Sequence, residues 1–251
     1  MFIEWHNLSG NSILIPSERP KAIVHFIGGA FVGIIPNLSY RWLLEHLSQQ
    51  GYLVIATPFR NIFDHLKIAQ NLLNSFEQIL EHLTVTKKIE TKDLPNYGIG
   101  HSMGCKLHLL ICTQFNVKRT GNILISFNNS AANEAIPFGK YLPIAEFIPT
   151  PRETQNLILK SYQTPFNCLI KFDNDRIDRT ASLIPVLQRR FPDTTYILTL
   201  PGNHLTPLSQ DLKWYPRKGL PLSQFVRWLD LQLSYDLYRL NRKIISWLDF
   251  F

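Results

Sequence analysis

The sequence has no long apolar run and no leader-like start. None of its apolar stretches approaches the roughly 18 to 20 residues that cross a bilayer, so we expect no membrane span. Residues 1–6 contain neither a cationic segment nor a long apolar stretch, and we therefore expect no signal peptide. There is also no internal repeat or low-complexity tract, which argues against a repeat array and against a disordered chain.

Cysteine is scarce as well. The three cysteines are Cys105, Cys112 and Cys168, an odd number without close pairing. Such spacing is not that of a disulfide framework or of a zinc cluster. We therefore expect reduced cysteines, a cytoplasmic protein, and no metal ion or other cofactor.

The chain lacks concentrated charge, although its net charge is +7. Adjacent cations occur only as pairs, whereas nucleic-acid-binding proteins usually gather Lys and Arg on one element. We expect no nucleic-acid partner. Examples are Lys87-Lys88, Lys118-Arg119 and Arg189-Arg190.

The C-terminal tail allows two interpretations. Arg239 and Lys243 alternate there with apolar residues such as Leu240, Ile244 and Leu248. A peripheral contact with a membrane surface would use this pattern, and so would a last helix packed on a sheet. We favour the packed helix and keep the membrane contact as the alternative.

What the chain does have is a regular alternation of buried strands and amphipathic helices. This alternation predicts parallel βαβ units and therefore an α/β protein with a doubly wound, mostly parallel sheet. A hairpin of two shorter strands, 2–5 and 12–15, would add an antiparallel edge. We expect a single domain spanning residues 1–251. The predicted central strands are 22–27, 52–56, 95–99, 122–127, 168–172 and 195–200, and the main predicted helices are 39–50, 66–83, 103–111, 152–162 and 181–190.

Residues 128–165 interrupt the alternation. They show no clear strand and contain four prolines. We interpret the segment as a small lid over the strand ends, with a plain surface excursion as the alternative. Its apolar residues favour an apolar acyl pocket beneath it; they are Ile136, Phe138, Tyr141, Leu142, Ile144, Phe147 and Ile148.

The strongest motif is Gly100-His101-Ser102-Met103-Gly104, between a predicted buried strand and a predicted helix. In this context a G-x-S-x-G match predicts a strained turn that exposes the serine hydroxyl above the sheet. The two glycines let the strand and the helix pass closely. Ser102 is therefore the candidate nucleophile.

A nucleophilic serine needs a base and a group that orients the base. His204 directly follows the last predicted strand, whereas most other histidines lie inside predicted helices or strands. The preceding strand ends in a loop with three acidic residues. We choose Asp175 as the orienting carboxylate and keep Asp178 and Asp173 as alternatives, because Asp178 could instead cap the next helix.

The order Ser102, Asp175, His204 resembles that of the α/β-hydrolase superfamily, and the resemblance covers nearly the whole chain. Asp175-Arg176-Ile177 looks like the acid turn of that family, and Gly202-Asn203-His204 like its base turn. Details around Gly28-Gly29-Ala30-Phe31 and the serine motif look most like an uncharacterised group of cyanobacterial and plastid proteins within it.

The resemblance implies an oxyanion hole made by the backbone N–H of Met103 and one from Gly29 or Ala30. Many family members have His-Gly where this chain has Ile27-Gly28. Because the donor is a backbone group, the hole can survive that change.

These residues predict a serine hydrolase that cleaves a carboxylic ester or thioester of a small-molecule acyl substrate through an acyl-enzyme. An acyltransferase using the same residues is one alternative. A non-catalytic binding protein that keeps the hydrolase shell is the other.

Overall fold

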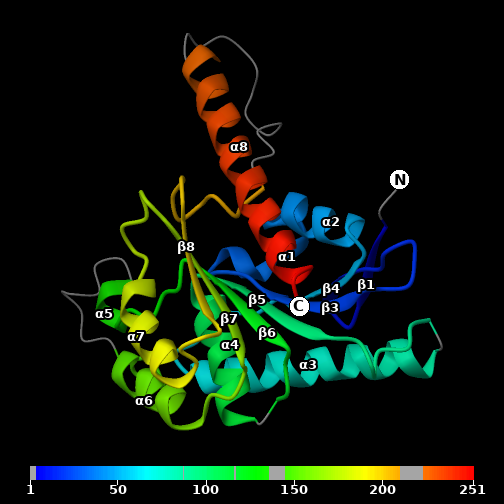
Figure 1. Cartoon of the computed structure of the whole chain (residues 1–251), viewed down its shortest axis with the longest axis horizontal. Coiled ribbons are helices and arrows are strands. Elements are labelled where there is room, and N and C mark those ends of the chain that lie inside the picture. Colours follow the sequence, from blue (N-terminus) through cyan, green and yellow to red (C-terminus); the bar gives the residue numbers. More distant parts are fainter. Residues whose placement is uncertain (1–3, 87, 116, 136–144, 210–222) are drawn as a thin grey trace.

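The computed structural model describes residues 4–86, 88–115, 117–135, 145–209 and 223–251, and side chains of the last range from residue 235 onward. Its centre is one eight-stranded sheet with the order β1-β2-β4-β3-β5-β6-β7-β8 (Figure 1). The strands are β1 Trp5–Leu8, β2 Asn11–Leu14, β3 Ala22–Ile27, β4 Tyr52–Ala56, β5 Asn96–His101, β6 Gly121–Ile125, β7 Phe166–Phe172 and β8 Thr195–Leu200.

From β4 to β8 all neighbouring strands are parallel, and the N-terminal hairpin supplies the antiparallel edge. The turn of the hairpin contains Ser9 and Gly10 with φ angles of 50° and 82°, the left-handed conformation that two-residue hairpin turns require. Pairing begins with Trp5 opposite Leu14, so the first strand lies later in the chain than predicted. Residues 2 and 3 of the predicted strand lie outside the described residues.

Helices cover both faces of the sheet, as a doubly wound fold requires (Figure 1). The helices α3, α4, α6 and α7 pack on one face, and α2 and the C-terminal part of α8 pack on the other. The helical segments are η1 Val32–Ile34, α1 Pro36–Ser39, α2 Arg41–Gln49, α3 His65–Val85, α4 Met103–Gln114, α5 Ala132–Ala135, α6 Pro151–Ser161, α7 Thr180–Arg190 and α8 Ser223–Leu248.

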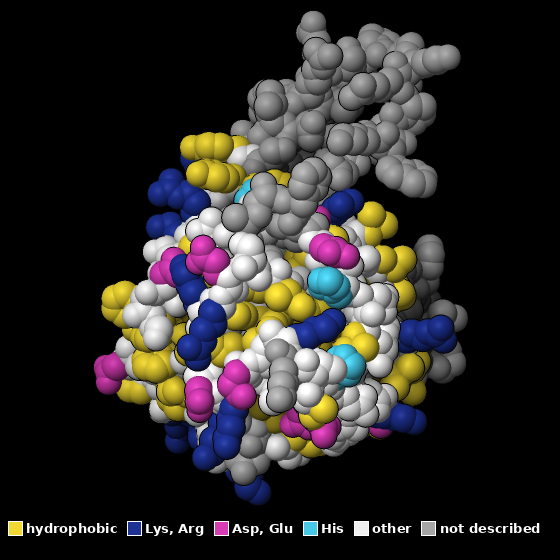
Figure 2. All heavy atoms as spheres, turned by 90° about the vertical axis from the view of Figure 1, so that its right-hand side faces the viewer, with side chains coloured by type: hydrophobic (Ala, Val, Ile, Leu, Met, Phe, Trp, Pro, Cys, Tyr) yellow, Lys and Arg dark blue, Asp and Glu magenta, His cyan; other side chains and the backbone are white. Residues whose placement is uncertain are grey.

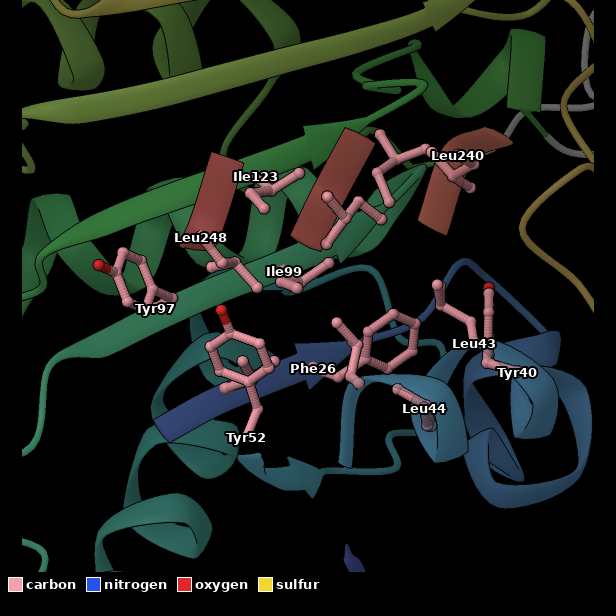
Figure 3. Close-up of a cluster of buried hydrophobic side chains, with 14 of the residues drawn as sticks. Phe26, Tyr40, Leu43, Leu44, Tyr52, Tyr97, Ile99, Ile123, Leu240 and Leu248 are labelled. Carbon is pink, nitrogen blue, oxygen red and sulfur yellow. The ribbon is translucent and has the colours of Figure 1, made fainter. Parts of the chain in front are cut away.

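Figure 3 shows the apolar layer between the sheet and the helices α2 and α8. Leu240, Ile244 and Leu248 of α8 are almost completely buried in it, so these apolar residues of the tail pack on the sheet. None of the helices in the described ranges is long and apolar enough to cross a membrane. The sheet and α2 contribute Phe26, Leu43, Leu44, Tyr52, Tyr97, Ile99 and Ile123, and Tyr40, which directly precedes α2, belongs to the same layer.

Local signals set most element boundaries. β3, β4 and β8 have the predicted bounds, and the Asp64 carboxylate accepts a hydrogen bond of 2.9 Å from the Lys67 N–H at the start of α3. Gly51, with φ of 93°, follows α2 as a C-terminal glycine does. β6 ends at Ile125, before the predicted boundary, because Ser126 adopts a φ of 50° and turns the chain out of the sheet.

Of the predicted lid, 128–165, the described parts contain α5, α6 and an isolated bridge between Asp64 and Ile148. Ile136, Phe138, Tyr141, Leu142 and Ile144 lie outside the described residues, so the apolar lid surface predicted for them stays a prediction.

On the face that Figure 2 shows, the described Lys and Arg side chains are scattered among acidic and apolar ones. This distribution agrees with the sequence, in which adjacent cations occur only as pairs. The absence of a nucleic-acid partner remains a prediction.

A buried polar cluster lies between the sheet and α3. The Arg119 guanidinium donates to Nδ1 of His25 at 2.9 Å and to Nδ1 of His108 at 2.7 Å. Burial and the Arg119 charge hold the pKa of both histidines well below the ordinary value, so both are neutral acceptors. Gly98 makes room for the cluster, because a Cβ there would lie 2.1 Å from Arg119 Nη1 and 2.2 Å from Asn122 Oδ1.

We predict that the fold is acid-labile. His25, His65, His101 and His108 are buried with lowered pKa values, about 3 for His65 and His101. In the unfolded chain these histidines bind protons near pH 6.5, whereas in the folded chain they stay neutral. Their contribution to the free energy of unfolding is therefore complete above pH 6.5 and is lost as the pH falls below that value. Each histidine contributes about 1.4 kcal/mol per pH unit. Urea unfolding at pH 7.5, 6.0 and 5.0 should show steeply falling midpoints, and a constant midpoint would contradict the prediction.

Candidate active site

The predicted site residues converge at one edge of the sheet. Ser102 follows β5, Asp175 lies in the loop after β7, and His204 lies in the loop after β8. These strands are parallel, so their carboxyl ends meet at the same edge, where ligands bind in open α/β sheets. The loop with Gly29 and Ala30 follows β3 at that edge too.

The turn at Ser102 has the strained geometry of a nucleophile elbow. Its φ and ψ angles are 55° and −118°, a conformation that non-glycine residues rarely adopt. A Cβ on Gly100 would lie 2.6 Å from Cys105 N, and one on Gly104 would lie 2.1 Å from Ile27 O. Both glycines are therefore required so that α4 can pass close to β5 and to the end of β3.

Ser102, His204 and Asp175 form a continuous hydrogen-bonded chain. His204 Nε2 lies 2.9 Å from Ser102 Oγ, and His204 Nδ1 lies 2.7 Å from Asp175 Oδ2. An ionised carboxylate only accepts hydrogen bonds, so it holds the proton on Nδ1 and leaves Nε2 as the acceptor for the serine hydroxyl. This is the arrangement that a general base requires.

Asp175 is held in the ionised state. Burial acts to raise its pKa, but the hydrogen bond and charge of His204 outweigh burial, and the pKa lies below its ordinary value. Its second oxygen, Oδ1, accepts from the N–H groups of Ile177 and Asp178 at 3.0 and 3.1 Å. The carboxylate is therefore fixed toward the imidazole by its own loop.

The other two acidic residues have different contacts. Asp178 Oδ1 accepts from the N–H and the hydroxyl of Thr180 at the start of α7, and burial raises its pKa. Asp173 Oδ1 accepts from Gly202 N–H at 3.1 Å and links the ends of β7 and β8. Among the three candidates, Asp175 is the one hydrogen-bonded to His204.

Two backbone N–H groups beside Ser102 can receive an oxyanion. Met103 is the first residue of α4, so its N–H has no acceptor within the helix. The N–H of Gly29 already donates to the Tyr40 hydroxyl oxygen at 2.8 Å. The next N–H, that of Ala30, has no hydrogen bond to the described residues.

Tyr40 and His101 are buried beside the hydrogen-bonded chain of Ser102, His204 and Asp175, and neither was predicted from the sequence as a site residue. Tyr40 Oη lies 2.8 Å from His101 Nδ1, and His101 Nε2 lies 2.9 Å from the backbone oxygen of His204. Burial is the main cause that lowers the pKa of His101 to about 3, so its ring is neutral. For His101 the sequence offered one signal, its position directly before Ser102.

A cavity of about 590 Å³ opens above Ser102 and His204. Lys106, one helical turn after Ser102, also lines it; its ammonium donates to Pro149 O at 2.9 Å, and burial lowers its pKa to about 8. Among the described residues no three His, Cys, Asp or Glu side chains gather as metal ligands would. Apolar side chains of the cavity wall include Phe31, Ile62, Phe63, Phe147, Ile177 and Leu205.

The fold is that of the α/β-hydrolases, as the sequence predicts. Three solved structures share it at 11 to 16% sequence identity. A soluble variant of monoglyceride lipase from Saccharomyces cerevisiae is 15% identical, with a TM-score of 0.59, over 98% of this chain and 94% of that one. A thermostable carboxyl esterase from Bacillus coagulans is 11% identical, with a TM-score of 0.58, over 99% and 97%. The thioesterase domain from the curacin biosynthetic pathway is 16% identical, with a TM-score of 0.52, over 83% and 95%.

Within this fold class the chain belongs to the family described as "Protein of unknown function (DUF1350)", whose sequence profile matches residues 4–250. No curated protein matches the chain. The description of the family names no activity.

The elbow geometry predicts that Gly104→Ala unfolds or strongly destabilises the protein. The new methyl group would overlap the Ile27 carbonyl, and the backbone on both sides would have to move, which in packed cores costs about 1–3 kcal/mol or more. Thermal unfolding should show a much lower midpoint. Gly10→Asn is the control, because Gly10 has open space and Asn tolerates its positive φ. Equal midpoints for the two variants would contradict the prediction.

Proposed function

We propose that this protein is a serine hydrolase that cleaves a carboxylic ester or thioester through an acyl-enzyme intermediate. The observation that carries the proposal is the hydrogen-bonded chain from Ser102 Oγ through the His204 ring to Asp175 Oδ2. Ser102 and His204 line a cavity that can receive a substrate. A shared fold alone would not support it, since folds host many functions.

In the proposed reaction His204 Nε2 takes the Ser102 proton while Oγ attacks the acyl carbonyl carbon. The imidazolium then protonates the leaving alcohol or thiol, and the acyl group stays on Oγ. Water, deprotonated by the same nitrogen, attacks the carbonyl carbon of the acyl-enzyme. As the bond from that carbon to Oγ breaks and the acid leaves, Nε2 returns the proton to Ser102 Oγ. Asp175 stabilises the imidazolium in both steps.

The negative charge that develops on the carbonyl oxygen needs donors already in position. We assign Met103 N–H as the first donor and Ala30 N–H as the second, because Gly29 N–H is engaged with Tyr40. The Gly29 carbonyl accepts from Gly33 N–H at 2.8 Å. In a trans peptide the N–H and C=O groups point in opposite directions, so Ala30 N–H is directed away from Gly33.

The apolar side chains already named in the cavity wall support an apolar acyl group as the part of the substrate that lies beside Ser102 and His204.

The predicted lid segment, 128–165, contributes to the wall of the same cavity. Its residues that line the cavity include Asn128, Asn129, Ser130 and Phe147. This lining supports the interpretation of the segment as a lid within one domain of residues 1–251.

Two further proposals concern the setting of the enzyme. Three buried, unpaired cysteines support a reducing compartment, the cytoplasm. The motifs around Gly28 and Ser102 support kinship with the uncharacterised cyanobacterial and plastid proteins of the superfamily.

The proposal predicts that a fluorophosphonate probe labels the wild-type protein and spares Ser102→Ala. The probe reacts with a serine whose proton is taken by a base, so labelling requires His204 as well. In-gel fluorescence after identical exposure measures it, with heat-denatured wild type as the background. Equal labelling of both proteins, or of neither, would mean that Ser102 is not the nucleophile.

The contacts of the acidic loop predict different effects for two matched substitutions. Asp175→Asn should lower kcat for a p-nitrophenyl ester by about a thousandfold to ten-thousandfold, because the amide favours the wrong imidazole tautomer. Asp173→Asn should stay close to wild type, since an amide oxygen can still accept from Gly202 N–H. If Asp173→Asn lost as much activity as Asp175→Asn, the assignment of the orienting carboxylate would be wrong.

A further inference from the structure

Tyr40 joins two segments of the candidate site. One is the loop with Gly29 and Ala30 after β3, which we call the oxyanion loop, and the other is the serine elbow at Ser102. Tyr40 lies between α1 and α2, at the edge of the apolar layer of Figure 3, and is fully buried. Its ring packs against the loop so closely that a Cβ on Gly28 would lie 2.7 Å from Cε2. A Cβ on Gly29 would lie 3.2 Å from His101 Nδ1 and from Ser102 Cβ. These glycines bring the loop, Tyr40 and the elbow together.

The direction of every hydrogen bond in this cluster follows from its ends. The His204 backbone oxygen can only accept, so His101 donates to it from a protonated Nε2. In the neutral ring Nδ1 then carries a lone pair and accepts from the Tyr40 hydroxyl. The hydroxyl oxygen is left to accept from Gly29 N–H, which can only donate. The chain of donors and acceptors is complete, with no unpaired group in it.

We propose that Tyr40 and His101 are positioning residues that hold the oxyanion loop and the base turn in register with Ser102. This inference rests on the proposed function, because it assigns residues that support the same reaction. Tyr40 fixes the Gly29 N–H, and the Gly29 carbonyl is fixed by Gly33 N–H at 2.8 Å. The peptide between Gly29 and Ala30 is thereby held from both sides, and so is the direction of the Ala30 N–H.

The same chain fixes the base. His101 is adjacent to Ser102 in the sequence and bonds the main chain of His204, so the serine and the imidazole are tied together independently of their own hydrogen bond. Because a shift of about 1 Å in a reacting group can cost a hundredfold in rate, such a tie matters for catalysis. Asp175 orients the ring of His204, and His101 locates its backbone.

Kinetics with Tyr40→Phe test the proposal. We expect kcat for p-nitrophenyl butyrate to fall about tenfold to a hundredfold, less than the loss of a whole oxyanion donor, while KM stays close to the wild-type value. Tyr162→Phe is the matched control. Tyr162 is equally buried, and its hydroxyl accepts from Asn122 and donates to Asn167, outside the site. We expect both variants to lower the melting temperature and only Tyr40→Phe to lower kcat.

A double-variant cycle separates positioning from general destabilisation. If Tyr40 and His101 act as one unit, the double variant Tyr40→Phe/His101→Leu loses little more kcat than the more damaged single variant. Wild-type kcat in Tyr40→Phe, an equal kcat loss in Tyr162→Phe, or additive losses in the cycle would each overturn the proposal.

A spectroscopic measurement keeps the test independent of turnover. In ¹⁵N-histidine NMR spectra, assigned with the His101→Leu variant, His101 should keep one neutral form, protonated on Nε2, from pH 8 to pH 6, where the protein is still folded. A ring protonated on Nδ1, or an imidazolium at pH 6, would overturn the inference. If the wild type neither reacts with fluorophosphonate nor hydrolyses esters, the proposed function fails, and this spectrum still decides the hydrogen-bonded arrangement.

Discussion

The candidate active site depends on the close approach of α4 to the end of β3. Gly104 lies against the Ile27 carbonyl, where no side chain would fit. This contact holds Ser102 in a left-handed conformation that costs on the order of 1–3 kcal/mol and persists only when neighbouring structure fixes it. Ser102 N–H donates to Ile125 O at 2.9 Å, and Asn128 N–H donates to Ser102 O at 3.3 Å. β3 and β6 together therefore enforce the strained turn that lifts the serine hydroxyl toward His204.

Three of the buried neutral histidines, His25, His108 and His101, lie in two settings that differ in their hydrogen-bond partners. His25 and His108 accept from Arg119 within the core, where they pair two nitrogens of a guanidinium whose burial would otherwise be more costly. His101 instead connects Tyr40 to the main chain of the loop that carries His204. A neutral imidazole both donates and accepts, so it can join an acceptor to a donor across a short distance. The first cluster lies inside the core, and the second joins the loops of the candidate active site.

The sequence predicts the sheet well because buried parallel strands are continuous apolar runs, as β3 and β4 show. The sequence does not predict the end of β6, because a serine at position 126 does not indicate a positive φ. The sequence restricts the candidates for the orienting carboxylate to the loop after β7. The choice of Asp175 depends on how that loop folds around its Oδ1. Tyr40 is not visible as a site residue, because its contact with His101 joins positions 61 residues apart and its local pattern is that of a core position.

In an open parallel sheet the loops at the carboxyl edge come from distant parts of the chain, and only the strands hold them together. This protein adds side-chain links between those loops. Asp173 joins the β7 and β8 loops through Gly202, Tyr40 joins the β3 loop to the elbow, and His101 joins the elbow to the β8 loop. Each link ends on a backbone group, so it fixes where the chain runs as well as how a side chain points. Loops are ordinarily the most mobile parts of a fold, and cross-links of this kind restrict how far the loops of the candidate site can move relative to one another.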